Sequence, residues 1–209
     1  PFTQVKNEKR YNHKEGMSGT NEQSKEEQEY EIVKVVGNNV YFYTDVDDES
    51  VFEFNRILTK LDMDLRKQYI DWCIDDLPTI KIFIQSPGGD LFAGLSAHDH
   101  IASLKCNTVT IADGQCASAA AIMFLAGDKR LVKKNSYVMI HQLATDFWGK
   151  FEDIKDELKN CNLMMENIRS ICTEKTQLSE HKLKKLLKHD LFLTADKCLK
   201  YGVADDVYS

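Results

Sequence analysis

The sequence has no apolar run long enough to cross a membrane. A spanning helix needs about 20 consecutive apolar residues, and no hydrophobic stretch of the chain approaches that length. The N-terminus is polar throughout and shows no secretory signal. We therefore expect a protein without a membrane partner.

Basic clusters and metal-ligand spacings are lacking as well. The net charge is −6 at pH 7, whereas a general nucleic-acid binder is usually basic, so no nucleic-acid partner is expected. The six cysteines form no CxxC pair and no Cys/His cluster with zinc spacing, so no metal is expected. Scattered cysteines in apolar surroundings favour reduced thiols and a cytoplasmic location.

The first 29 residues offer little that could be buried. Charged and small polar residues dominate positions 1–29, a composition that indicates an N-terminal arm that is flexible or is ordered by a partner. The folded domain is expected over 30–209, because 43% of the whole chain is hydrophobic.

Alternating strand and helix patterns follow the arm. Short β-rich runs lie between segments with helical apolar spacing, which predicts an α/β domain with a largely parallel sheet. The expected strands are 32–36, 40–44, 80–84, 108–112 and 137–140. The expected helices are 51–65, 69–74, 91–104 and 119–126.

A long helix is predicted over about 149–175. Seven apolar residues recur there in steps of three and four and form one stripe: Phe151, Ile154, Leu158, Cys161, Met165, Ile168 and Cys172. The helix would be roughly 40 Å long at 1.5 Å per residue. We expect it to protrude from the domain, and the seven-residue period suits packing against another helix.

Ser118 lies where a predicted strand and tight turn meet a strongly apolar helix. At a helix N-terminus, backbone N–H groups and the helix dipole favour developing negative charge, as a nucleophilic serine requires. The alternative is that Ser118 only caps the helix, and serine is among the commonest N-cap residues. Its local sequence does not decide between the two.

His141 and Asp190 are the candidate partners of the serine. His141 follows an apolar strand and suits a general base. Taken alone, however, its position favours a core histidine satisfied by a carbonyl. Asp190 precedes an apolar run, and a buried carboxylate there would hold the histidine tautomer. It could instead be a helix-terminal aspartate, and Asp196, Asp205 and Asp206 compete for the same role.

The turn Ser-Pro-Gly-Gly at 86–89 follows a predicted strand. Paired glycines allow unusual dihedral angles and close backbone approach, so the turn could supply an N–H group to an oxyanion. A plain strand-to-helix connection is the alternative.

Together these segments resemble the Clp protease proteolytic subunit (ClpP) family. The resemblance rests on four motifs in order and covers about residues 32–208. They are Ile-Gln-Ser-Pro-Gly-Gly at 84–89, Gly-Gln-Cys-Ala-Ser-Ala-Ala at 114–120, Asn-Ser-Tyr-Val-Met-Ile-His-Gln at 135–142, and His-Asp-Leu-Phe-Leu-Thr-Ala at 189–195 with Tyr-Gly-Val-Ala-Asp at 201–205.

The resemblance implies a crotonase-like α/β domain whose protruding helix is the family's handle. It implies a triad of Ser118 as nucleophile, His141 as general base and Asp190 as its carboxylate partner. The amides of Gly89 and Ala119 would form the oxyanion hole.

The same resemblance implies where the substrate binds. The residues expected to contact it are Gly88, Gly89, Gln142 and Leu143.

The resemblance also implies a homo-oligomer of stacked heptameric rings that hydrolyses unfolded polypeptides in an enclosed chamber. No nucleotide-binding loop is present and no cofactor is expected, so ATP would be used only by a separate AAA+ unfoldase.

Some features depart from the family pattern. Leu143 stands where the family usually has proline, the segment between Val46 and Ser86 is longer than usual, and the arm does not resemble the family's N-terminal loops. These departures suggest a divergent, virus-encoded branch acting in the host cytoplasm.

Three other functions stay open. They are a peptidase with a Ser/Lys dyad, related to signal peptide peptidase A, a crotonase-type acyl-CoA enzyme, and a non-catalytic paralogue that forms rings.

Overall fold

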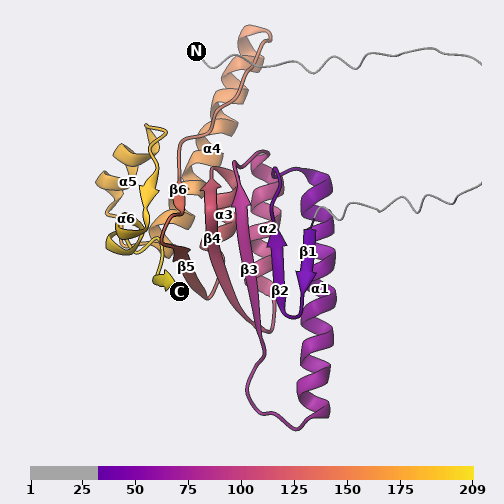
Figure 1. Cartoon of the computed structure of the whole chain (residues 1–209). Helices are drawn as coiled ribbons and strands as arrows, with labels where there is room; N and C mark the ends of the chain where they lie inside the picture. Colours follow the sequence, from indigo (N-terminus) through magenta and orange to yellow (C-terminus); the bar gives the residue numbers. More distant parts are fainter. Residues whose placement is uncertain (1–32) are drawn as a thin grey trace, which may run out of the picture. The chain divides into compact units, whose positions relative to one another are not determined.

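The computed structural model describes residues 33–209 (Figure 1). The N-terminal arm predicted at 1–29 lies outside these residues. The α/β class is confirmed, because strands and helices alternate and the central strands are parallel.

The described residues form one eight-stranded sheet with the order β1-β2-β3-β4-β5-β8, in which β6 pairs with β4 and β7 pairs with β6. The strands are β1 (Val33–Val36), β2 (Asn39–Phe42), β3 (Thr79–Ser86), β4 (Asn107–Ala117), β5 (Lys129–Lys133), β6 (Tyr137–Met139), β7 (Leu193–Thr194) and β8 (Asp206–Tyr208). The helices are α1 (Asp48–Asp71), α2 (Leu91–Ser103), α3 (Ala119–Leu125), α4 (Phe151–Lys175), α5 (Glu180–Leu187) and α6 (Ala195–Lys200). The β1–β2 hairpin is antiparallel, and β2 to β5 run parallel.

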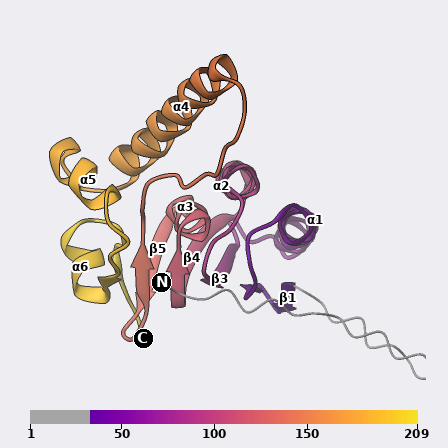
Figure 2. The same cartoon turned by 90° about the horizontal axis from the view of Figure 1, so that it is seen from above.

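The core lies between the sheet and the helices α1, α2 and α3, which share one face of the sheet (Figure 2). Alternate residues of β3 (Ile80, Ile82 and Ile84) are fully buried. A strand places alternate side chains on one face, so these isoleucines mark the face that the helices cover. All seven residues of α3 are buried, which explains the apolar run after Ser118.

Helix α1 is one continuous helix, so the prediction of two separate segments at 51–65 and 69–74 is wrong. The residues between the two segments are Arg66, Lys67 and Gln68, all good helix formers, and no glycine or proline interrupts them. Asp47 caps the helix by accepting a hydrogen bond from the Ser50 amide, 2.8 Å away.

Strand β4 is longer than the predicted strand at 108–112. It continues through the expected turn as far as Ala117, and its register with β3 shifts between Ile84 and Ser86. Gly114, at φ +77°, lies within this irregular stretch. The shift lets the strand run directly to Ser118.

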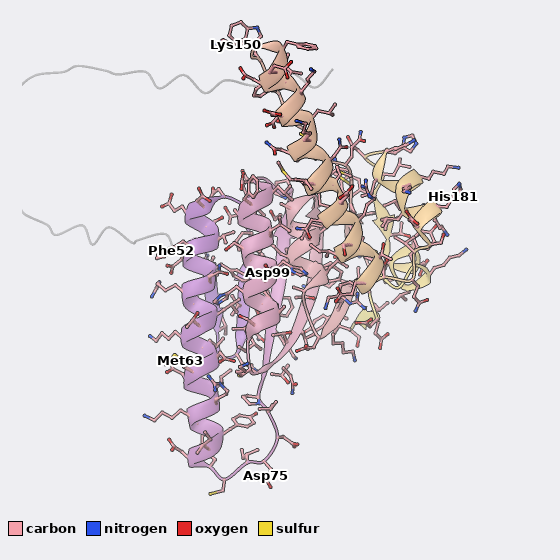
Figure 3. All side chains as sticks on the ribbon, turned by 180° about the vertical axis from the view of Figure 1, so that it is seen from behind. Phe52, Met63, Asp75, Asp99, Lys150 and His181 are labelled. Carbon is pink, nitrogen blue, oxygen red and sulfur yellow. The ribbon has the colours of Figure 1, made fainter. Side chains whose placement is uncertain are left out.

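Helix α4 occupies Phe151–Lys175, within the range predicted from the apolar stripe. It extends beyond the ends of the strands, and Lys150 lies at its free end (Figures 1 and 3). Ile168 and Cys172 are buried, whereas Phe151, Ile154 and Leu158 are exposed. One half of the stripe therefore packs on the domain and the other half has no cover within residues 33–209. None of the helices in this range has the length and hydrophobicity of a membrane span.

Candidate active site

The candidate residues gather at the carboxyl ends of three adjacent strands. Ser118 follows β4, the glycine turn at 87–89 follows β3, and His141 lies two residues after β6. Because β4 pairs in parallel with both β3 and β6, these ends meet at one edge of the sheet. Ligands of α/β proteins usually bind at this edge.

Ser118 occupies the N-cap position of α3 without capping it. Its side chain accepts no hydrogen bond from the helix backbone. Instead its Oγ lies 2.8 Å from Nε2 of His141. Ser118 therefore does not act as a structural N-cap, which was the alternative.

The backbone of Ser118 is strained. Its φ is 56° and its ψ is −125°, a conformation that residues with a Cβ rarely adopt. Such strain concentrates at functional sites. The Ser118 amide is held by the carbonyl of Met139, 2.8 Å away, so the strand that carries the histidine also fixes the serine.

His141 joins Ser118 to Asp190. Its Nδ1 lies 2.9 Å from Oδ1 of Asp190, while Nε2 faces the serine. An imidazole that donates from Nδ1 to a carboxylate presents Nε2 as an acceptor to the hydroxyl. The three predicted residues are thus in one hydrogen-bonded chain.

Asp190 differs from the sequence expectation in its surroundings. A buried carboxylate was expected, but the Asp190 side chain is 74% exposed and that of His141 is 22% exposed. Solvent competes for an exposed carboxylate, so this hydrogen bond is weaker than one in a dry site.

The competing aspartates do not reach the histidine within the hydrogen bonds of the described residues. Asp205 binds Arg130, with Oδ1 2.6 Å from Nη2. Burial by itself would raise the pKa of Asp205, but the hydrogen bonds from Arg130 outweigh it and lower the pKa below its ordinary value.

The glycine turn packs closely against Ser118. Gly88 has φ +98°, and a Cβ on it would lie 2.5 Å from the Ser118 Cβ and 2.7 Å from the Ala117 carbonyl oxygen. A Cβ on Gly89 would overlap the carbonyl oxygen of Val46. Both positions therefore need glycine. Gly88, expected to bind substrate, packs against Ser118 and is not among the residues that line the pocket.

The two predicted oxyanion donors are oriented by their neighbours. The Val46 backbone bonds to the Gly88 carbonyl and the Asp90 amide, so the Gly89 N–H points away from Val46. Ala119 is the first residue of α3, and its N–H has no intrahelical acceptor. Both groups border the same pocket as Ser118.

A pocket of about 340 Å³ opens beside Ser118 and His141. Gln142 and Leu143, both expected to bind substrate, line it. Their amides bond to the Leu187 carbonyl at 2.7 Å and to the Met165 Sδ at 3.1 Å, which ties the segment after His141 to α5 and α4. The other lining residues come mainly from α2, α3 and α4: Gly89, Asp90, Leu91, Phe92, Ala119, Ile122, Ile140, Ala144, Thr145, Glu157, Met164 and Ile168.

Cysteine is not the reactive group here. Cys116, two residues before Ser118, is fully buried, and burial raises the pKa of its thiol. Cys198 is also buried, which raises its pKa to about 12. Only the thiolate is a good nucleophile, so the serine is the candidate.

Two parts of the site were missed at the sequence level. Val46 positions Gly89 across 43 residues of sequence by a lone bridge, and no local pattern marks such a contact. Glu157 and Met164 of α4 line the pocket, although only the apolar stripe beside them was singled out. The signal that could have found Glu157 was a carboxylate on α4 directly beside the apolar stripe.

Comparisons with known proteins bear on the family and the fold of the chain. A family model described as Clp protease matches residues 24–209. An ATP-dependent Clp protease proteolytic subunit of Deinococcus radiodurans is 32% identical over 130 residues, which are 61% of this chain and 64% of that protein. The match thus spans less than two thirds of the relative's length.

A solved structure of a ClpP1 mutant from Listeria monocytogenes has a similar fold. Its TM-score is 0.71 with 26% sequence identity, over 83% of this chain and 92% of that one. This match confirms the predicted crotonase-like α/β fold. Both relatives are bacterial, so the expectation of a virus-encoded branch finds no support.

Proposed function

The chain belongs to the Clp protease family, and on this basis we propose that it is a serine endopeptidase that hydrolyses unfolded polypeptides. The observation that carries the proposal is the continuous chain of hydrogen bonds Asp190–His141–Ser118, with distances of 2.9 Å and 2.8 Å. A serine becomes a nucleophile when a positioned base can take its proton.

The proposed reaction begins with proton transfer. His141 takes the proton from the Ser118 Oγ as that oxygen attacks a peptide carbonyl. The carbonyl oxygen becomes negative and is stabilised by the N–H groups of Gly89 and Ala119. His141 then returns the proton to the leaving amine, and an acyl group remains on Ser118.

Deacylation repeats these steps with water as the nucleophile. His141 accepts a proton from water, the hydroxyl attacks the acyl carbon, and Ser118 regains its hydrogen. Asp190 holds Nδ1–H throughout and stabilises the imidazolium. The chain's own side chains and amides perform this chemistry, and ATP enters only through a separate AAA+ unfoldase.

Assembly into stacked heptameric rings is part of the proposal. The exposed Phe151, Ile154 and Leu158 of α4 supply an apolar surface that a second copy would cover. Enclosure in such a chamber would restrict the site to unfolded chains. The buried free thiols of Cys106, Cys116 and Cys172 suit a reducing compartment, so we expect a cytoplasmic location.

A non-catalytic ring-forming paralogue is the second candidate. Its support is the 74% exposed side chain of Asp190, because an exposed carboxylate orients an imidazole weakly. The two candidates differ in a single readout, the hydrolysis of a peptide bond.

Hydrolysis of unfolded casein by the assembled protein tests the proposal. We expect fragments from the wild type and a loss of at least about 10³-fold in rate in Ser118→Ala. The Ser103→Ala variant changes an exposed serine of α2 and is expected to keep wild-type activity. Equal rates for wild type and Ser118→Ala, or no hydrolysis by the assembled protein, would favour the non-catalytic candidate.

A further inference from the structure

The pocket beside Ser118 has apolar walls and acidic groups. The side chains of Ile122 in α3 and of Ile140 and Leu143 in the segment after β6 line it. Among the described residues, the ionisable lining residues are Asp90, Glu157 and His141, and neither a lysine nor an arginine is present. An apolar pocket with an acidic side favours a long side chain that ends in a cation.

Glu157 is the carboxylate available for such a cation. The Asp90 Oδ1 already accepts the Ala93 amide as the N-cap of α2, at 2.8 Å. Glu157 is half-buried, and its polar contact is the weak donor Cys161 Sγ at 3.8 Å. The pocket therefore contains one carboxylate with no strong donor among residues 33–209.

Neighbouring cations of α4 do not neutralise Glu157. Lys155 pairs with Glu152 at 2.9 Å, and Lys159 pairs with Asp156 at 2.8 Å. Within the described residues no ion pair includes Glu157, so its charge remains directed at the pocket.

Glu157 shares one face of α4 with two apolar residues of the pocket. Met164 and Ile168 follow it at intervals of seven and four residues, so all three lie on one face of the helix and line the pocket. The seven residues between Glu157 and Met164 correspond to about 10 Å along the axis. Figure 3 shows that the N-terminal end of α4, marked by Lys150, is its free end. Glu157 therefore lies toward the outer end of an otherwise apolar wall.

From this arrangement we propose that Glu157 determines substrate specificity and that the site prefers peptides with lysine or arginine next to the scissile bond. The inference rests on the proposed peptidase function. The aliphatic part of the substrate side chain packs against the Ile122 and Leu143 walls, and its cationic end reaches the Glu157 carboxylate. The chemistry at Ser118 is unchanged, and only the choice of substrate depends on Glu157.

Matched peptides test this preference in the assembled wild-type protein. Fluorogenic peptides that differ only in lysine or norleucine before the scissile bond have similar aliphatic length, so the ratio of their kcat/KM values isolates the charge. We expect a ratio of about two to five in favour of lysine, as for a partly exposed ion pair. Glu157→Gln should bring the ratio close to one, chiefly by slowing the lysine peptide, and Glu157→Lys should invert it.

A control variant separates the pocket charge from the net charge of the helix. Glu166→Gln removes the same charge from an exposed position of α4 that does not line the pocket, and it should leave the ratio unchanged. Rising salt should lower the ratio in the wild type but not in Glu157→Gln.

The outcomes distinguish the inference from the function on which it rests. Hydrolysis of the norleucine peptide at least as fast as the lysine peptide, or an equal effect of Glu157→Gln and Glu166→Gln, would overturn the specificity role alone. If neither peptide is hydrolysed and Ser118→Ala behaves as the wild type, the peptidase function itself fails, and the inference with it.

Discussion

At Ser118 a hydroxyl group and a strained backbone occur in the same residue. The φ of 56° places the side chain where its oxygen faces His141 rather than the N-terminal amides of α3. A serine that capped the helix would be satisfied and unreactive. The unusual backbone of Ser118 thus favours a nucleophile over a helix cap.

Replacing Ser118 by glycine or alanine should reveal this strain. Both variants remove the hydroxyl, but glycine tolerates positive φ and alanine does not. We expect Ser118→Gly to be more stable than Ser118→Ala by about 1 kcal/mol. Urea unfolding of the two proteins measures the difference, and a less stable glycine variant would contradict the strain.

Gly88 is the residue most sensitive to an added methyl group. In Gly88→Ala the new Cβ would lie 2.5 Å from the Ser118 Cβ, so the turn or the serine must move. We expect peptide hydrolysis to fall by about 10²-fold, because a displacement near 1 Å costs that much in rate. Steady-state kinetics gives the value. Gly37→Ala is the control, since its φ is also positive but nothing lies within 4 Å of the new Cβ, and its activity should be unchanged.

Among the elements, helix α1 is linked by one buried carboxylate to the two residues that precede β4. Asp62 of α1 accepts hydrogen bonds from the amides of Lys105 and Cys106, at 2.9 Å and 2.7 Å, and pairs with Arg66 at 2.9 Å. Burial alone would raise the pKa of Asp62, but the hydrogen bonds from Cys106 and Lys105 outweigh it and lower the pKa. The ionised form therefore stabilises the fold.

Asp62→Asn should lower the free energy of unfolding by about 1.5–3 kcal/mol at neutral pH, the usual contribution of hydrogen bonds to a charged group. A lowered pKa contributes stability above the unfolded value of about 3.9, and this contribution is lost as the pH falls through the lower folded value. The difference between wild type and variant should thus shrink below about pH 4. Urea unfolding between pH 3 and 7 checks this. A difference that stays constant over that range would contradict it.

The sequence predicted the helices and strands with strong periodicity and missed those with weak patterns. Strand β5 reads Lys-Arg-Leu-Val-Lys, and its charged residues conceal a short strand in the parallel sheet. Helix α1 appeared as two segments because its last turns are largely exposed. Both errors have the same cause. Few residues of β5 and of the last turns of α1 are buried, so neither segment shows a clear apolar periodicity.

The site itself was predictable only in part. The family resemblance implied a triad of Ser118, His141 and Asp190, and the three side chains lie in one hydrogen-bonded chain, while their catalytic roles stay a prediction. The exposure of Asp190 was not predictable, because it depends on which parts of the fold pack over the segment that follows α5. Glu157 was missed because the pocket wall comes from α4, whose periodicity showed only its apolar stripe.

For the whole molecule, the exposed half of the α4 stripe predicts association. Leu158 is 63% exposed and belongs to this half. Leu158→Asp should shift the protein from the large assembly toward smaller species, because it places a charge in an apolar contact. Sedimentation velocity measures the change. Asn160→Asp, an exposed position of α4 off the stripe, should leave assembly intact. Unaltered assembly in Leu158→Asp would show that the stripe is not the contact.

The most direct measurement of the central claim is the covalent labelling of Ser118 by a fluorophosphonate, followed by mass spectrometry. The account predicts one phosphonylated residue per chain in the assembled wild-type protein, located at Ser118. Labelling should be absent in Ser118→Ala and slower by at least about 10³-fold in His141→Ala. An assembled protein that resists the probe, or a label that persists in Ser118→Ala, would contradict the account.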